Sequence, residues 1–237
     1  MRVVVDRLRM ARRQRLARRL ALAGLAVLGL GLFVSLRAEP TRVYVGLAYA
    51  TLMAGTVLSW SGVAMMNRWV APPRPEVVLP AALGGLGAPW ALYHWALPAA
   101  HVALAPWGLV VLHAVGHAGP AEVRGNRWRD GRPLVARLLS FGRQPLRDPS
   151  RLVRWEVEAL RRALAEREPA LADVPIDAVA VFLHPAARLV AVEPALPVVA
   201  LGDLRGWLRA QGKGRRLPPA DVRRLAAVLD ALAAEGG

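Results

Sequence analysis

The 237-residue chain contains no cysteine and few acidic residues: 17 Asp and Glu stand against 32 Lys and Arg. Without cysteine, the chain has no disulfide framework, no thiolate zinc site and no cysteine nucleophile. Hydrophobic residues nevertheless make up 55% of the chain and the formal net charge is +15, a combination that excludes a disordered tail protein. A chain that is both apolar and strongly basic must segregate the two properties along its length, as a membrane protein with a soluble part does.

Charged residues are absent from two early stretches, residues 20–36 and 43–66. As helices at ~1.5 Å per residue they would be about 25 and 36 Å long, against about 30 Å for the hydrocarbon core of a bilayer. We therefore expect a transmembrane hairpin over residues 20–66, with a tight turn at residues 37–42. A cleaved signal peptide is the competing interpretation of the first stretch, but its apolar core would be unusually long and a second span follows directly.

Basic residues cluster before the first apolar stretch, where residues 1–19 contain eight arginines and one aspartate. By the positive-inside rule, this basic N-terminal segment and the chain after the hairpin lie in the cytosol, which predicts a multi-pass protein of the cytoplasmic (inner) membrane. We expect these arginines to contact anionic lipid headgroups, with nucleic-acid binding as the alternative. Small residues at four-residue spacing would let the two helices pack closely, or join copies of the chain into a homo-oligomer: Gly46, Ala50 and Ala54, and Gly55 and Ser59.

A proline-rich linker, residues 67–75, leads into a third charge-free stretch at residues 77–121. Five prolines interrupt this stretch, and its longest proline-free piece has 13 residues, too few for a membrane span. Two further spans are the alternative topology, but short apolar runs bounded by Pro and Gly are typical of buried strands. We expect strands at residues 90–95, 101–105 and 109–114.

The rest of the chain has the pattern of a mixed-sheet α/β domain. Hairpin-turn dipeptides occur at Gly125-Asn126 and Asp130-Gly131. Asp148 and Pro149 predict a helix start, and we assign its apolar stripe to Leu152, Trp155, Ala159, Leu160 and Ala163. Further strands are expected at residues 177–183, 189–192 and 197–201, a helix after Asp203, and a C-terminal helix within residues 211–237.

Several strings in this order resemble the nuclease-related domain (NERD), a bacterial branch of the PD-(D/E)xK nuclease fold. They are the apolar strand-turn-strand at residues 101–112, the helix start at Asp148-Pro149, and the closing strands and helix at residues 179–182 and 196–208. The resemblance implies a domain of this fold over residues 76–210. It also implies a bacterial protein, because some bacterial membrane proteins carry this domain behind a two-helix hairpin.

The catalytic residues that the resemblance implies do not carry over to this chain. The Asp expected before the second strand falls on Ala100, the acidic residue and Lys of the E-x-K motif fall on His113 and Val115, and the helix Gln falls on Leu152. Glu76 is the one possible remnant. Because Mg²⁺-dependent phosphodiester cleavage needs converging carboxylates, we predict an inactive nuclease-like domain with no metal or cofactor.

Two catalytic or metal-binding alternatives remain open. The first is an active membrane-tethered nuclease that uses Glu76 and carboxylates later in the chain. The second is a zinc site, since His113 and His117 have the spacing of a helical zinc pair. Gly116 and the strand character of the preceding residues disfavour that helix.

Residues 121–154 contain nine arginines and only three acidic residues. A basic strip of this kind suits either a nucleic-acid backbone, with Trp128 and Trp155 as stacking residues, or the anionic inner leaflet of the membrane. The predicted function is a membrane-anchored cytosolic binding module for nucleic acid or a protein partner, with a purely structural envelope scaffold as the alternative. The predicted binding residues are Arg124, Arg127, Arg129, Arg132, Arg151 and Arg154.

Overall fold

The computed structural model describes residues 1–37, 41–133, 135 and 146–235. The chain divides into two units, each described separately below: a helical unit of residues 9–72, and a globular unit that contains residues 1–8 and most of the chain after residue 72. The protein therefore combines two long N-terminal helices with a mixed α/β part, the fold class expected from the sequence.

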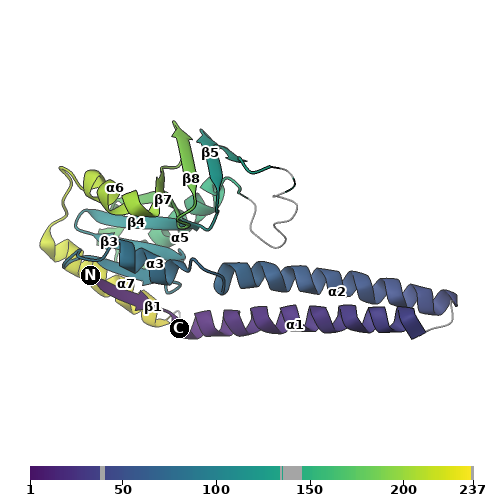
Figure 1. Cartoon of the computed structure of the whole chain (residues 1–237). Coiled ribbons are helices and arrows are strands. Elements are labelled where there is room, and N and C mark those ends of the chain that lie inside the picture. The colour runs from purple at the N-terminus through teal and green to yellow at the C-terminus, as the bar shows by residue number, and fades with distance from the viewer. Residues whose placement is uncertain (38–40, 134, 136–145, 236–237) are drawn as a thin grey trace. The chain divides into compact units, whose positions relative to one another are not determined.

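The helical unit consists of helices α1 (Arg7–Arg37) and α2 (Arg42–Trp69) (Figure 1). Both are long and apolar enough to cross a membrane, and only 11% of the most apolar window of each is buried. The Oγ1 atom of Thr41 caps α2 by accepting a hydrogen bond from the Tyr44 amide at 3.5 Å. The predicted apolar stretches lie inside these two helices, whereas part of the predicted turn, residues 38–40, falls outside the described residues.

The two helices pack antiparallel through glycines that allow close backbone approach. A Cβ atom on Gly24 would lie 2.7 Å from the Ser59 Cα, and one on Gly62 would lie 2.6 Å from the Ala21 Cα. Glycine at these positions is therefore required for the observed helix spacing. Gly55 and Ser59 are at this contact, as expected from their spacing.

The other predicted small-residue stripe does not contribute to the packing of α1 on α2. A Cβ on Gly46 would have no atom within 4 Å, and Ala50 and Ala54 are exposed. The prediction of close packing is therefore confirmed for Gly55 and Ser59 and wrong for this stripe. The four-residue spacing of small residues does not by itself show which face of α2 meets α1.

The globular unit is built on a six-stranded sheet with strand order β1-β2-β3-β4-β7-β9. Strands β2, β3 and β4 form an antiparallel meander, and β1, β7 and β9 each run parallel to the strand beside them. The alternative of two further membrane spans is wrong, because residues 77–121 contribute buried strands to this sheet. The strands are β1 (Arg2–Val5), β2 (Ala91–His94), β3 (His101–Ala105), β4 (Gly108–Val115), β7 (Ile176–Phe182) and β9 (Val198–Ala200).

Strand β1 corrects the prediction that residues 1–19 form only a basic N-terminal segment. The Arg2 amide donates to the Trp90 carbonyl and the Asp6 amide to the His94 carbonyl, both at 3.1 Å. The Arg2 guanidinium also donates to Asp230 at 2.6 Å and to the Tyr93 hydroxyl at 2.8 Å. The three consecutive valines after Arg2 favour a strand, but the surrounding arginines dominate the sequence signal.

Helices cover both faces of this sheet (Figure 1). Helices α3 (Pro75–Ala82) and α6 (Leu204–Gln211) pack in the core that contains Val110 and Leu112. Helices α5 (Ser150–Arg167) and α7 (Pro219–Glu235) pack in the core with Leu109 and Val111, on the opposite face because side chains alternate along β4. Helix α7 is therefore part of this unit, not a separate C-terminal segment. Two short 3₁₀ turns, Pro169–Leu171 and Leu201–Asp203, complete it.

The predicted apolar stripe of α5 is shifted relative to the observed one. Leu152 and Trp155 are 43% and 58% exposed, and the buried positions are Ser150, Val153, Glu156, Leu160 and Leu164. The helix also begins one residue later than predicted, at Ser150 and not at Pro149, with the Asp148 carboxylate accepting from the Ser150 amide at 2.9 Å. Trp155 misled the prediction because a large aromatic residue is usually buried.

A second, three-stranded sheet has the order β6-β5-β8. It consists of β5 (Pro120–Arg124), β6 (Arg127–Asp130) and β8 (Arg188–Val192). The predicted turn at Gly125-Asn126 joins β5 to β6, with Gly125 at a φ of 54°. Asp130-Gly131 ends β6 and does not form the second hairpin that we expected.

Candidate functional site

The positions that correspond to the nuclease motif lie together at one end of β3 and β4. The register pairs Val102 with Val111, and continuing it places Ala100 opposite His113. Val115 lies two residues further, on the same face of β4. The structure therefore brings together three of the positions implied by the resemblance, but their side chains are a methyl group, an imidazole and an isopropyl group.

The two remaining positions do not complete a metal site. Glu76 belongs to α3, which covers the other face of the sheet, and it lies 3.9 Å from Arg74. Leu152 projects from α5 toward solvent. Among the residues that the structure describes, no group of three or more His, Asp or Glu side chains could hold a metal ion. His113 lies on strand β4, so His113 and His117 do not form the helical zinc pair that was considered.

Glu156 is a buried carboxylate that sequence reasoning missed, because the predicted stripe turned Trp155 inward instead. Val111 of β4 and Leu160 of α5 belong to one core cluster, and Val115 and Val153 to another. His113 lies between Val111 and Val115 on the same face of β4, the face that α5 covers, and Glu156 lies between Val153 and Leu160 on α5. One carboxylate and one imidazole are fewer hard ligands than Mg²⁺ hydrolysis uses.

Two further histidines form a buried pair on β2 and β3. The Nδ1 atoms of His94 and His101 are 2.8 Å apart, so one imidazole donates to the other. The Trp95 ring packs edge-on against His101. Burial lowers the pKa of His94 to about 4, which keeps this imidazole uncharged at neutral pH. The two histidines face each other at the end of β2 and the start of β3, and both are buried in the core.

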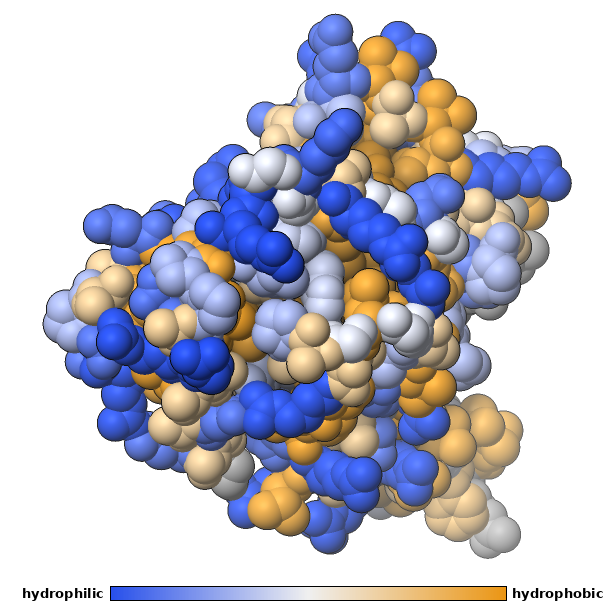
Figure 2. All heavy atoms as spheres, turned by 90° about the vertical axis from the view of Figure 1, so that its left-hand side faces the viewer, coloured by the Kyte–Doolittle hydropathy of each residue, from blue (hydrophilic) through white to orange (hydrophobic). Residues whose placement is uncertain are grey.

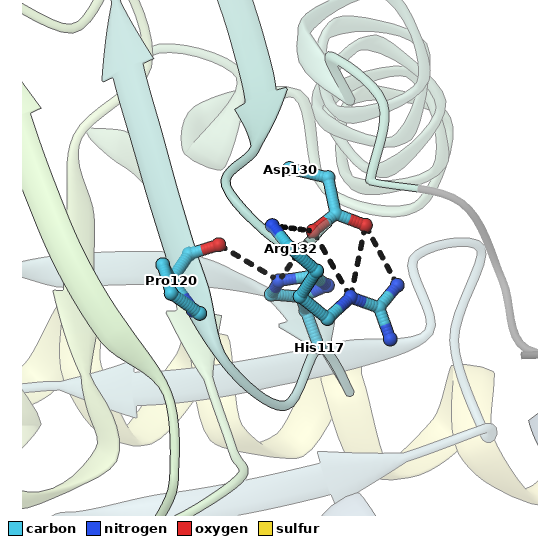
Figure 3. Close-up of polar contacts among 4 residues, drawn as sticks. All are labelled: His117, Pro120, Asp130 and Arg132. Atoms are coloured by element: carbon cyan, nitrogen blue, oxygen red, sulfur yellow. Dashed lines mark hydrogen bonds and ion pairs between the residues drawn. The ribbon is translucent and has the colours of Figure 1, made fainter. Parts of the chain in front are cut away.

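A compact ion-pair cluster ties the two ends of the β5–β6 hairpin together (Figure 3). Arg132 donates to both carboxylate oxygens of Asp130, at 2.6 Å from its Nη2 and 3.0 Å from its Nε. The His117 Nε2 lies 3.2 Å from the Pro120 carbonyl oxygen and 3.6 Å from Asp130 Oδ1. Hydrogen bonds from Arg132 hold the pKa of Asp130 below its ordinary value. Arg132 thus stabilises the hairpin and is not part of an open basic surface, contrary to the prediction.

The outer face of the second sheet gathers arginines from all three strands. Arg124 lies opposite Arg127, Arg129 opposite Glu122, and Val192 of β8 beside Arg124. Cross-strand partners share a face of a sheet, so one exposed face carries Arg124, Arg127, Arg129, Arg188, Val190 and Val192. We call these six residues the arginine face. Beside these six residues the same side of the sheet carries one carboxylate, Glu122, which forms an ion pair with Arg124.

The arginine face contains three of the predicted binding residues and one that the sequence did not single out. Arg188 is brought to it by the parallel pairing of β5 with β8, in a strand that was predicted without its partner. Trp128 points to the other side of the sheet and stacks on Phe182, with ring centroids 6.0 Å apart. Trp128 is therefore unavailable for stacking on a base.

The other predicted arginines lie elsewhere. Arg151 and Arg154 are exposed on the first turns of α5, next to the exposed Trp155. Arg137 and Arg143, which also belong to the basic strip, lie outside the described residues. The view in Figure 2 shows hydrophilic side chains in several separate strips divided by apolar ones. The arginines on β5, β6 and β8 differ from these because they share one face of a single sheet.

No protein-family model, no curated protein and no solved structure matches this chain. Fold and site together define a mixed α/β protein with two long apolar N-terminal helices and an arginine-rich sheet face.

Proposed function

We propose that the protein is a membrane-anchored binding module of the bacterial cytoplasmic membrane. In this proposal α1 and α2 form a transmembrane hairpin, and the globular unit is a cytosolic, nuclease-related domain that binds a partner without cleaving it. The arginine face is its binding surface.

The single observation that carries the hairpin is the pairing of β1 with β2. Strand β1 precedes α1 in the chain, and β2 follows α2, yet the two are hydrogen-bonded in one sheet. Both ends of the helix pair must therefore lie on the same side of any membrane that the helices cross. Large apolar side chains such as Leu22, Leu25 and Val57 are exposed along both helices, which suits contact with lipid.

The orientation follows from the arginines at the start of α1. Residues 7–19 contain seven arginines, and positively charged segments next to a span remain in the cytosol. The pairing of β1 with β2 then puts the globular unit in the cytosol as well.

The absence of cleavage follows from the side chains at the strand ends. The order of a strand-turn-strand (β3 and β4), a helix from Ser150 and a strand from Ile176 supports the proposed nuclease-related domain. At its strand ends the positions of the expected acidic residues are held by Ala100 and His113. Neither side chain is the hard oxygen ligand that Mg²⁺ prefers.

Cysteine accessibility tests the hairpin, because the natural chain has no cysteine of its own. Single substitutions Val3→Cys on β1, Thr41→Cys before α2 and Asn126→Cys in the β5–β6 turn would be treated with a membrane-impermeant maleimide. In inside-out vesicles we expect labelling at positions 3 and 126 but not at 41, and the opposite result in right-side-out vesicles. Labelling of all three positions from one side would refute the hairpin.

A nuclease assay tests the absence of catalysis. The parent protein with Mg²⁺ is expected to leave DNA and RNA intact, and cleavage by it would overturn the proposal. The triple variant Ala100→Asp, His113→Glu, Val115→Lys asks whether the strand ends keep the geometry of a nuclease, and gain of cleavage would support that origin.

A further inference from the structure

We infer that the arginine face docks on the anionic lipid headgroups of the bilayer. The inference rests on the proposed function in one respect, namely that the hairpin keeps the globular unit within reach of a membrane.

The charge on this face is largely uncompensated. Glu122, on the same side of the sheet, pairs with Arg124, while no carboxylate of the described residues forms an ion pair with Arg127, Arg129 or Arg188. Some arginines elsewhere in the globular unit do pair with acidic residues, as Arg132 does with Asp130 and Arg215 does with Asp177. A concentration of unpaired guanidinium groups on one face selects an anionic partner.

The positions of these groups suit a flat, repeating anionic surface. Adjacent strands lie about 4.8 Å apart, and alternate residues on one strand are about 7 Å apart. The four guanidinium groups are therefore distributed in two dimensions over a sheet surface. A nucleic-acid strand is better followed by a groove with basic side chains along its length.

The apolar residues on the same face favour lipid over nucleic acid. Val190 and Val192 are 57% and 43% exposed and lie among the arginines in the register of β8 with β5. Surfaces that combine basic and apolar side chains insert at the boundary between headgroups and acyl chains. Single-stranded nucleic acid is instead held by aromatic stacking, and the one aromatic residue of these three strands, Trp128, is stacked on Phe182 on the other face.

The test uses the full chain with Asn126→Cys, labelled with an environment-sensitive fluorophore and reconstituted into vesicles. Phosphatidylcholine vesicles that contain phosphatidylglycerol are compared with phosphatidylcholine alone. We expect a blue shift of the dye only with phosphatidylglycerol, reduced at high salt. Each arginine near an anionic surface contributes about five-fold (~1 kcal/mol) to the docked fraction, so replacing all four with Gln should reduce the ratio of docked to undocked protein several hundred-fold.

A matched variant removes the same charge elsewhere, from four exposed arginines on α5, α6, α7 and the segment before α7: Arg162→Gln, Arg209→Gln, Arg216→Gln and Arg223→Gln. It should keep the blue shift. The double variant Val190→Thr, Val192→Thr keeps side-chain shape and charge, and should retain salt-sensitive docking with a smaller blue shift.

Three results would overturn the inference. They are no difference between the two lipid compositions, an equal loss in the matched variant, or a dye response to duplex DNA or polyuridylate in place of the lipid response. Resistance of the protein to alkaline extraction measures the anchor separately. If alkali extracts the protein and the dye still shows a phosphatidylglycerol-dependent blue shift, the hairpin is refuted and the docking surface is supported. The arginine face can bind added vesicles without an anchor.

Discussion

The contact between α1 and α2 predicts that two glycines are indispensable and two others are not. The test variant is Gly24→Ala with Gly62→Ala, and the control is Gly29→Ala with Gly46→Ala. In the test variant each new Cβ lies 2.7 or 2.6 Å from a backbone Cα of the other helix, which is 0.7 or 0.8 Å short of the 3.4 Å of ordinary contact. In the control variant nothing lies within 4 Å of either Cβ.

The comparison of the two double variants isolates the steric cost. Replacing Gly with Ala in a helix interior stabilises the helix by up to about 1 kcal/mol per site, and this gain is common to both variants. Overpacking costs about 1–3 kcal/mol per site and affects the test variant alone. We therefore expect the helix pair of the test variant to be about 4 kcal/mol less stable than that of the control.

A disulfide between the helices reports their separation. A Cβ on Gly31 would lie 3.3 Å from the Thr51 Cβ, close to the spacing of about 3.5–4.5 Å that disulfides use. Gly31→Cys with Thr51→Cys, combined with each double variant, is oxidised at increasing concentrations of SDS. We expect cross-linking of the test variant to be lost at a lower SDS concentration than that of the control. Equal midpoints would refute the packing of α1 on α2 through glycine.

Three further predictions concern the globular unit. The pKa of His94 is lowered to about 4 in the folded protein, so between pH 6.5 and 4 its imidazole is protonated in the unfolded chain but not in the folded one. The free energy of unfolding should therefore drop by about 3 kcal/mol by pH 4. His94→Gln should remove this part of the pH dependence of Tm. Asp130→Asn breaks the nearly buried ion pair with Arg132 and should lower the free energy of unfolding by on the order of 2 kcal/mol at pH 7. This difference in stability between variant and parent should vanish as pH falls below the ordinary pKa of Asp130 and through its lowered value in the folded protein. Asp230→Asn weakens the half-exposed contact with Arg2, so amide exchange in β1 should accelerate by up to about five-fold (~1 kcal/mol), whereas unchanged exchange would mean that this pair does not hold the strand.

Local patterns were sufficient to predict most of the elements of the fold. Strands β3 and β4 were expected within a residue of their observed ends, because Pro106 and Gly108 limit the apolar runs on either side of their turn. Partners distant in the chain were not predictable in this way. Strand β1 pairs with residues 89 positions away, and a four-residue strand among arginines has no periodicity of its own.

The sequence was sufficient to locate the arginine strip, but not to show which of its arginines share one face of the sheet. Alternation along β5 and β6 separates Arg124, Arg127 and Arg129 from Trp128 once the strands are known. The loss of Arg132 to Asp130 and the gain of Arg188 depend on contacts between strands that no local pattern contains. Glu156 was missed for a related reason, since an error in helix phase exchanges a buried residue for its exposed neighbour.

The position of β1 in the sheet has a consequence for the timing of biosynthesis. Strand β1 leaves the ribosome before its partners, because Tyr93 and Asp230, which bind Arg2, are 91 and 228 residues behind it. At about 5–20 residues per second, Arg2 of β1 waits roughly ten seconds or longer before the Asp230 contact can close. In a chain that spans the membrane, β1 can meet β2 only after α2 has returned the polypeptide to the side where α1 began. In the proposed topology, completion of the sheet would therefore depend on correct insertion of the hairpin, and a chain inserted with a single span would expose an unpaired strand edge to proteolysis.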